Sequence, residues 1–395
     1  SFMRQRLFLV LSVSLLLIGI NTSFYMPYIS MFGLQEVGMS PMALGVFLSV
    51  STVGGIAAST IVGRISDKVQ SRKRVLMCVA AAGMAGYAVF AFSRAYIVLL
   101  FAALFVISFS RSTFPQLFAF ASGIDVHGRE ENRALVNGIL RAIFAIGWVV
   151  GPTIGALVLE ASGFTALYLT MAGMFAAILA VTGLFVKDRR TERAAPKGKP
   201  ATMLSRKMVL SAAGFCTIYL ATSLNGYALP LFVTETLGAD RKQVGLLLGL
   251  AAAIEIPLMI FGGYLVRHIG TSRLVKIGFV SYVAYAVSVL VARDPLLLYP
   301  IQVLNALAIS QIMGTGISYF QEMAPDRPGT TITLFNNTTA VGNVMGGMVF
   351  GAIISFFDYR SVYLFCALFA ALAVLLLHLA NARHAAKGRD ASVEA

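Results

Sequence analysis

The sequence predicts an all-α membrane protein with twelve transmembrane helices in two pseudo-symmetric bundles of six helices. Three observations support this class: long apolar segments, positive charge in alternate gaps between them, and an internal repeat. A helix of about 20 apolar residues crosses the ~30 Å hydrocarbon core, and it satisfies its backbone hydrogen bonds within the segment. The predicted spans are residues 5–32, 40–63, 75–93, 96–121, 133–160, 164–186, 208–236, 242–266, 273–292, 295–321, 329–356 and 360–381.

Positive charge is concentrated on one side of the predicted membrane. Charged residues are 12% of the chain, about half of the ~25% that is usual in soluble proteins. Of the 31 Lys and Arg residues, 24 fall on one side and five on the other, which predicts that both termini are cytoplasmic. The net charge of +14 could suit nucleic acid, but the basic residues are scattered over short loops, so no nucleic-acid partner is expected. The three cysteines lie in apolar spans and are expected to be packing residues, not metal ligands.

The two halves of the chain repeat each other. The widest gap between spans, residues 187–207, is rich in Lys, Arg, Pro and Ala and predicts a cytoplasmic linker. It separates an N-terminal bundle, 1–186, from a C-terminal bundle, 208–382, which a cytoplasmic tail, 383–395, follows. Such repeats resemble the major facilitator transporters, in which the substrate site lies between the halves near the middle of the membrane. The matching pairs, at offsets of 195 to 203 residues, are Gly45 and Gly245, Gly63 and Gly263, Pro27 and Pro230, Gly147 and Gly342, and Gly151 and Gly346.

The loop between the second and third spans resembles a major facilitator loop motif. Its glycine would let helices approach closely, and its aspartate could cap a helix end and pair with basic groups. That arrangement would form a cytoplasmic latch in the outward-open state. Gln70 and Ser71 depart from the usual glycine and basic residue, and a simple basic loop that sets topology is the alternative. The residues of this predicted cytoplasmic gate are Gly63, Asp67, Lys68, Arg72 and Arg74.

The fifth span carries a segment, 147–156, that resembles a motif associated with antiporters of the same superfamily. Gly147, Gly151 and Gly155 recur every four residues and give one smooth helix face for close packing. Pro152 frees a backbone carbonyl and allows a bend. Ala156 stands where the motif ends in glycine. The motif favours export, although a packing face with no bearing on transport direction remains the alternative.

Three charged residues lie well inside predicted spans and matter most for function: Arg111, Arg141 and Glu255. Each would cost several kcal/mol if it faced lipid, so each should face a cavity or a partner. Glu255 is the only carboxylate near the middle of a span, and its repeat counterpart is Gly55. A carboxylate in such a cavity can take up and release a proton. The three residues are therefore predicted to couple protons to transport; a static Glu–Arg bridge and direct substrate contact alone are the alternatives.

Amide side chains near the middle of the spans form a second group of candidates. Amides offer donors and acceptors together, which suits a substrate with many hydroxyl groups, although several could simply join helices. Aromatic rings from Tyr25, Trp148 and Tyr227 could supply flat apolar faces for a sugar ring. Together with these rings and the three charged residues, the predicted substrate site includes Asn21, Gln116, Asn137, Asn225, Asn305, Gln311, Asn336 and Asn337; Gln302, Gln321 and Asn343 belong to the same group of amides.

Nearly the whole chain resembles the bacterial sugar efflux transporters of the major facilitator superfamily. The resemblance is most specific in the segments 114–119, 141–152, 255–257, 302–306, 320–325 and 333–337. It implies efflux of small sugars or glycosides, by proton exchange, across the bacterial inner membrane. Arg111 departs from the pattern, which has a small or neutral polar residue there. The extra cation could favour an anionic substrate.

The sequence therefore predicts a monomeric exporter that works by alternating access. It contains no nucleotide-binding loop, metal cluster or nucleophile arrangement, so neither a cofactor nor enzymatic activity is expected. A multidrug or anionic-metabolite exporter on the same fold is one alternative, and a predominantly apolar cavity would support the drug exporter. A membrane receptor that transports nothing is another, but it would normally need a signalling domain.

Overall fold

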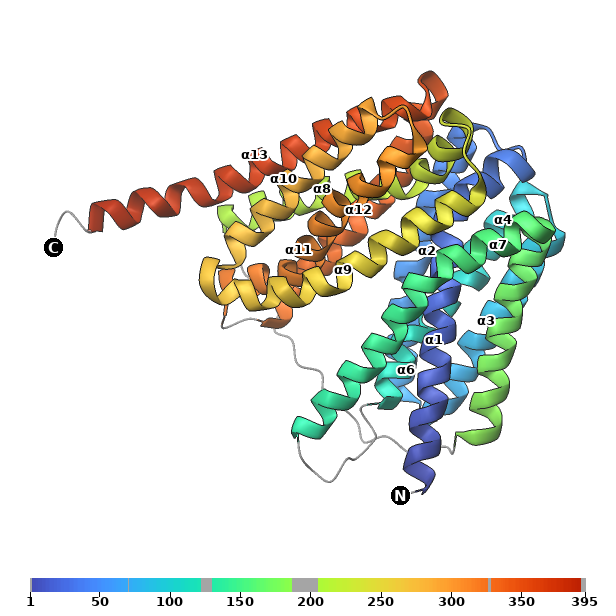
Figure 1. Ribbon diagram of the computed structural model, residues 1–395. Helices are drawn as coiled ribbons and strands as arrows, with labels where there is room; N and C mark the ends of the chain where they lie inside the picture. The colour runs from blue at the N-terminus through green and yellow to red at the C-terminus, as the bar shows by residue number, and fades with distance from the viewer. Residues whose placement is uncertain (1, 70, 122–129, 187–204, 326–327, 392–395) are drawn as a thin grey trace. The chain divides into compact units, whose positions relative to one another are not determined.

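Helices account for nearly all of the part of the chain that the computed structural model describes, residues 2–69, 71–121, 130–186, 205–325 and 328–391 (Figure 1). No strand occurs in these ranges. Eleven helices there are long and apolar enough to cross a membrane. The prediction of an all-α membrane protein is confirmed, and eleven such helices are found among the described residues where twelve spans are predicted.

The chain folds into two compact units, which are described separately. Unit 1 contains Ser1–Ala195 and Asp240–Gly249, and unit 2 contains Pro196–Ala239 and Leu250–Ala395. Up to residue 185 the elements are α1 (Phe2–Met31), η1 (Phe32–Glu36), α2 (Pro41–Lys68), α3 (Arg72–Phe92), α4 (Tyr96–Ala102), η2 (Ala103–Ile107), α5 (Ser108–Ser110), α6 (Thr113–Ala121) and α7 (Glu130–Phe185). From residue 206 they are α8 (Arg206–Leu231), η3 (Phe232–Thr236), α9 (Arg241–Ile269), α10 (Thr271–Val291), η4 (Pro295–Leu297), α11 (Leu298–Met323), α12 (Pro328–Phe356) and α13 (Tyr359–Ala391).

The difference in helix number arises at α7, which includes both predicted spans 133–160 and 164–186. Within α7, Gly163 has a φ of 75° and a ψ of −175°, which are not helical angles. Only glycine adopts such a conformation readily. Figure 1 shows α7 reversing direction, so that its two parts run in roughly opposite directions. The predicted boundary between two helices therefore coincides with a turn at Gly163, although helical structure continues almost without interruption on either side of it.

The predicted linker and tail differ in how far the structure describes them. Of the linker, residues 187–204 lie outside the described residues. The predicted tail begins at residue 383, yet α13 continues as a helix to Ala391. Its candidate membrane span, Tyr359–Ala382, reaches the last residue whose side chain is described.

The internal repeat is present in the local backbone of the two units. In unit 1, the π-helix η1 follows α1 and leads to Gly38, whose φ is 71°. In unit 2, the π-helix η3 follows α8 and leads to Gly238, whose φ is 67°. Both glycines hold the left-handed conformation that side chains disfavour. Because these features recur 200 positions apart, the two halves share backbone irregularities as well as helix order.

Glycines bring equivalent helices into close contact within each unit. The first part of α7 packs on α1, and α12 packs on α8. A Cβ atom built on Gly147 would lie 2.7 Å from the Leu16 carbonyl oxygen, and one on Gly342 would lie 2.6 Å from the Cys216 carbonyl oxygen. These distances are shorter than a Cβ contact allows. The antiporter-like segment of α7 thus has a packing role that the second repeat shares.

Arg94 closes the end of α3. Its guanidinium donates hydrogen bonds to the carbonyl oxygens of Phe90 and Ala91, both at 3.1 Å, and forms an ion pair with Glu36 at 3.0 Å. The guanidinium carbon also lies 5.3 Å from the centre of the Phe32 ring. A cation at this position satisfies carbonyls that the helix leaves unbonded and interacts favourably with the helix dipole.

Arg360 satisfies the free carbonyl groups at the end of α10, but it belongs to another helix. Near the start of α13, it donates to the carbonyl oxygens of Leu290 and Ala292, both at 2.7 Å. Asp358 caps the start of α13 by accepting hydrogen bonds from the hydroxyl and the N–H of Ser361. These bonds hold the pKa of Asp358 below its ordinary value. The cap is therefore retained at neutral pH and is lost as the pH falls through this lowered pKa.

Candidate functional site

Arg111 lies at a break in the helix predicted over residues 96–121. That helix consists of α4, the π-helix η2, α5 and α6, and the break between α5 and α6 falls at Arg111 and Ser112. The Ser112 N–H bonds the Phe109 carbonyl oxygen at 3.1 Å, a tighter turn than that of an α-helix. In unit 2, α11 runs without a break from Leu298 to Met323. The interruption is thus a local feature of the first repeat, and a short 3₁₀-type turn inside a helix often marks a functional hinge or a strained sequence.

The Arg111 side chain packs between α1 and α2. Its guanidinium carbon lies 5.6 Å from the centre of the Tyr25 ring, a distance that allows a cation–π interaction. A Cβ atom built on Gly55 would lie 3.0 Å from both Cδ and Nη1 of Arg111. Gly55 therefore leaves room for the cation. Gly55 is the repeat counterpart of Glu255. The second repeat therefore has a carboxylate at this position, whereas the first repeat has a glycine next to the Arg111 guanidinium.

Several hydroxyl groups near this break are buried without a hydrogen-bond partner in the described part of the chain. They belong to Tyr25, Ser112 and Thr113. Arg111 and Ser51 lie within reach of the Tyr25 hydroxyl, but neither meets it with hydrogen-bond geometry. Buried polar groups are normally paired. The Arg111 region thus combines an exposed cation with unsatisfied hydroxyl groups.

Arg141, on α7, rests on a different ring. Its guanidinium carbon lies 5.7 Å from the centre of the Phe118 ring on α6, and its side chain is exposed. In the described part of unit 1, neither Arg111 nor Arg141 forms an ion pair with a carboxylate. Each is therefore available to an anionic or hydroxylated ligand.

The predicted amides of unit 1 mainly join helices. Asn21 donates from Nδ2 to the Met171 carbonyl oxygen on α7 at 3.1 Å. Gln116 accepts from the Ser66 hydroxyl at 2.9 Å and so connects α6 to α2. Both amides are buried. The side chain of Asn137 lies outside the described residues, and Trp148 is half-buried on α7.

In unit 2, Asn225 is the acceptor at the centre of a buried cluster. Its Oδ1 accepts hydrogen bonds from the Tyr285 hydroxyl at 2.8 Å and from the Tyr363 hydroxyl at 3.2 Å. This cluster ties α8 to α10 and α13. Sequence analysis did not identify the two tyrosines, because nothing in their spacing along the chain shows that they converge on one amide. Tyr227 is buried with its ring centre 5.7 Å from that of Phe350.

Other amides of unit 2 retain unused hydrogen-bonding capacity. Asn305 donates from Nδ2 to Gln302 Oε1 at 3.0 Å within α11. The Gln302 Nε2 and Asn305 Oδ1 atoms are buried and have no partner in the described part of the chain. Gln311 donates to the Ser310 hydroxyl at 3.2 Å and, more weakly, to the Leu258 carbonyl oxygen at 3.4 Å, while its Oε1 is unpartnered among the described residues. Gln302 thus has an unused donor and Asn305 an unused acceptor, three residues apart on α11.

Glu255 is half-buried on α9, two residues before Pro257. In the described part of unit 2, it forms no ion pair with Lys or Arg. Asn336 and Asn337 lie exposed on α12, so their amides are accessible. The nearby Asn343 instead accepts from the Ser223 hydroxyl at 2.7 Å and joins α12 to α8.

The predicted cytoplasmic gate is only partly described. The side chains of Asp67 and Lys68 lie outside the described residues, so the latch stays a prediction. A Cβ atom on Gly63 would meet nothing within 4 Å, so the expected close helix approach is absent there among the described residues. Arg72 and Arg74 lie in the first turn of α3, where the Ser71 hydroxyl accepts from the Arg74 N–H. Lys73 donates to the Gly183 carbonyl oxygen at 2.8 Å and so anchors α3 to α7.

Comparison with known proteins places this arrangement in a family. The model of the MFS_1 like family matches residues 8–365, most of the chain. The chain belongs to the MFS_1 like family. Sugar efflux transporter B of Salmonella typhimurium is 32% identical to this family member, over 88% of this chain and 89% of that protein. Sugar efflux transporter C of Escherichia coli is 30% identical, over the same shares of the two chains.

The fold is also similar to that of solved transporters. The crystal structure of the nucleoside transporter NupG has a TM-score of 0.74 and covers 97% of this chain and 99% of its own. Its sequence identity is 15%, so the similarity concerns the fold alone. The sequence matches to the two sugar efflux transporters confirm the predicted resemblance to that group.

Replacement of Asn225 by alanine should destabilise the protein. Two buried tyrosine hydroxyl groups would lose their acceptor, at a cost of about 1–3 kcal/mol each. Thermal unfolding in detergent should therefore occur at a lower temperature for Asn225→Ala. The control is Asn336→Ala on the exposed face of α12, which should change stability by less than about 0.5 kcal/mol. A stable Asn225→Ala variant that has lost only substrate binding would contradict the structural role and favour direct contact.

Proposed function

We propose that this protein is a secondary active exporter of small sugars or glycosides in the bacterial inner membrane, driven by proton antiport through alternating access. Its relatives in Salmonella and Escherichia are named as sugar efflux transporters. The bundles 1–186 and 208–382 would be joined by the cytoplasmic linker 187–207, and the tail 383–395 would also be cytoplasmic. The chain would act as a monomer.

The observation that carries the sugar assignment is the Gln302–Asn305 pair. A sugar hydroxyl can donate one hydrogen bond and accept others, so a single hydroxyl could satisfy both Gln302 Nε2 and Asn305 Oδ1. Each atom is buried and makes no contact with hydrogen-bond geometry in the described part of the chain, although the Tyr285 hydroxyl lies within reach of Gln302. Leaving such a group unpaired costs about 1–3 kcal/mol. A polyhydroxylated substrate would remove that cost, whereas an apolar drug would not.

Glu255 is the proton carrier in this proposal. It is a carboxylate near the middle of a span, half-buried, without an ion pair in the described part of unit 2. Its repeat counterpart, Gly55, leaves room for the Arg111 guanidinium. The pseudo-symmetric frame thus carries charges of opposite sign in its two halves. Residues that serve packing alone would tend to be the same in both repeats. A difference in charge between the repeats therefore suits a coupling site better.

Glu255→Gln should abolish proton-driven transport in proteoliposomes. Glutamine keeps the shape of the side chain but cannot exchange a proton. Substrate binding should remain within about tenfold of the wild type, an allowance of ~1.4 kcal/mol. Glu160→Gln, which alters an exposed carboxylate near the end of a predicted span, is the matched control and should transport normally. Full gradient-driven transport by Glu255→Gln would eliminate Glu255 as the carrier.

A second candidate substrate class is the anionic sugar, and Arg111 is the observation that favours it. Its guanidinium is exposed and has no carboxylate partner in the described part of unit 1. Guanidinium groups bind carboxylate and phosphate through paired, charge-assisted hydrogen bonds, more strongly than they bind hydroxyl groups. In this proposal Arg111 faces the substrate, while Arg141 serves the proton switch with Glu255.

Exchange of each arginine for asparagine should separate these roles. Arg111→Asn should preserve or improve transport of neutral sugars and weaken transport of a sugar acid such as glucuronate. Arg141→Asn should impair transport of every substrate. Proteoliposome assays with both sugar types would measure the difference. Equal and complete loss by both variants for both sugar types would instead support a single structural charge network.

A further inference from the structure

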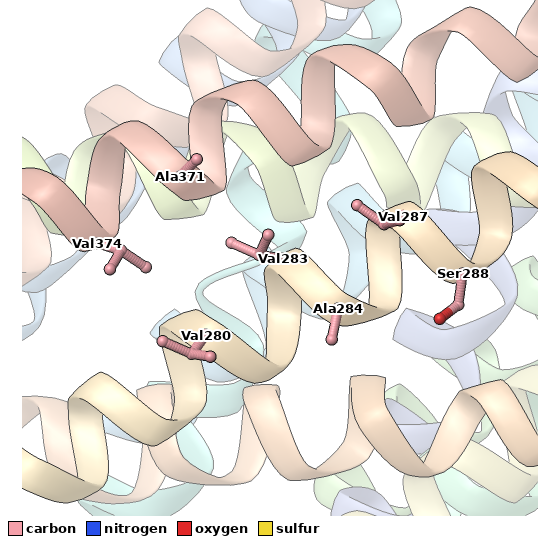
Figure 2. Close-up of a pocket in the computed structure, with 7 residues that line it drawn as sticks. All are labelled: Val280, Val283, Ala284, Val287, Ser288, Ala371 and Val374. Atoms are coloured by element: carbon pink, nitrogen blue, oxygen red, sulfur yellow. The ribbon is translucent and has the colours of Figure 1, made fainter.

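A groove runs along α10 on unit 2, away from the residues proposed to bind the substrate. It consists of two adjoining cavities of about 570 Å³ and 340 Å³, which share Val280. Figure 2 shows the larger cavity, where Val283 on α10 and Val374 on α13 face each other across the gap between the two helices. The residues lining the two cavities are Lys276, Ile277, Val280, Ser281, Val283, Ala284, Val287, Ser288, Ala371 and Val374.

The walls of this groove are apolar over a length that suits a lipid chain. From Lys276 to Ser288 the helix rises about 18 Å at 1.5 Å per residue. This is slightly more than half of the ~30 Å hydrocarbon core, the depth of one leaflet. Ser281 offers little polarity to the groove, because its hydroxyl donates to the Leu304 carbonyl oxygen at 2.9 Å.

One end of the groove is basic. Lys276 Nζ lies 3.2 Å from His378 Nδ1, which joins α10 to α13 at this end. Arg273 is exposed one turn before Lys276 on α10. Neither 271–291 nor 359–382 contains an aspartate or glutamate. At the very start of α10, the Thr271 hydroxyl donates a hydrogen bond to the Glu322 carboxylate. The groove therefore joins an apolar channel to a cluster of positive charge near a helix end.

We propose that this groove binds an anionic phospholipid, with an acyl chain along α10 and the phosphate headgroup at Lys276 and His378. The charge matches a phosphodiester, and basic residues at the membrane surface attract anionic lipids. The surrounding medium supplies the ligand directly. The proposal does not depend on the transported substrate, because none of the lining residues belongs to the proposed transport site.

Native mass spectrometry of the purified, delipidated full-length protein tests the proposal. Phosphatidylglycerol and phosphatidylethanolamine with identical acyl chains would be titrated separately. The wild type should prefer phosphatidylglycerol by about tenfold. The double variant Lys276→Ala/His378→Ala should lose this preference, whereas Lys276→Arg should keep it. Arg206→Ala, which removes an exposed cation on α8, is the control for net charge and should behave like the wild type.

A second variant tests the apolar part of the groove. Val283→Phe should weaken binding of both lipids, since the larger side chain would occupy the cavity. Val303→Phe on α11 adds the same side chain at an exposed position outside the groove and should have no effect. Glycerol 3-phosphate, a headgroup without chains, should compete only weakly. Equal binding of the two lipids by the wild type, an unchanged preference in the double variant, or a protein dimer formed in place of lipid binding would overturn the proposal.

Discussion

The lack of water in the hydrocarbon core is the constraint on which the rest of this structure depends. Each polar side chain placed there needs a protein partner, because an unpaired one costs free energy. Asn21, Gln116 and Asn225 meet this requirement by bonding to a neighbouring helix. They therefore hold each unit together.

Polar atoms that do not meet the requirement are correspondingly informative. In the described part of the chain, Tyr25, Ser112 and Thr113 around Arg111, and Gln302 and Asn305 on α11, keep buried atoms without partners. These atoms lie in both repeats, close to the residues proposed for substrate recognition. Hydroxyl groups of a ligand could supply partners to either set, so the sugar proposal follows from the same constraint that explains the packing.

The two repeats share a frame and differ in charge. Gly147 and Gly342 make equivalent close contacts, and π-helices follow equivalent helices in both halves. At the position shared by Gly55 and Glu255, however, the first repeat accommodates the guanidinium of Arg111 and the second carries the carboxylate itself. The residues shared by both repeats thus serve packing, while in the proposed mechanism the charged residues that differ between the repeats couple protons to transport.

Much of the fold could be predicted from the sequence, because apolar length and charge bias are properties of segments and do not depend on distant contacts. The gap between the predicted spans 133–160 and 164–186 contains the turn at Gly163 for that reason, even though the helix assignment continues through it. The site was harder to predict. Nothing in the local sequence distinguishes Asn225, which is used by Tyr285 and Tyr363, from Asn336, which is exposed. The break at Arg111 was likewise hidden, because the Ser and Thr residues that flank it also occur within continuous membrane helices.

Simultaneous measurement of sugar and proton fluxes by the wild-type protein tests the central claim most directly. Proteoliposomes loaded with a neutral sugar and a pH-sensitive dye would be placed in buffer of equal or lower external pH. The account predicts that external acid accelerates sugar release and that protons enter in proportion to the sugar that leaves. Sugar release at the same rate with and without the gradient, unaccompanied by proton entry, would contradict it.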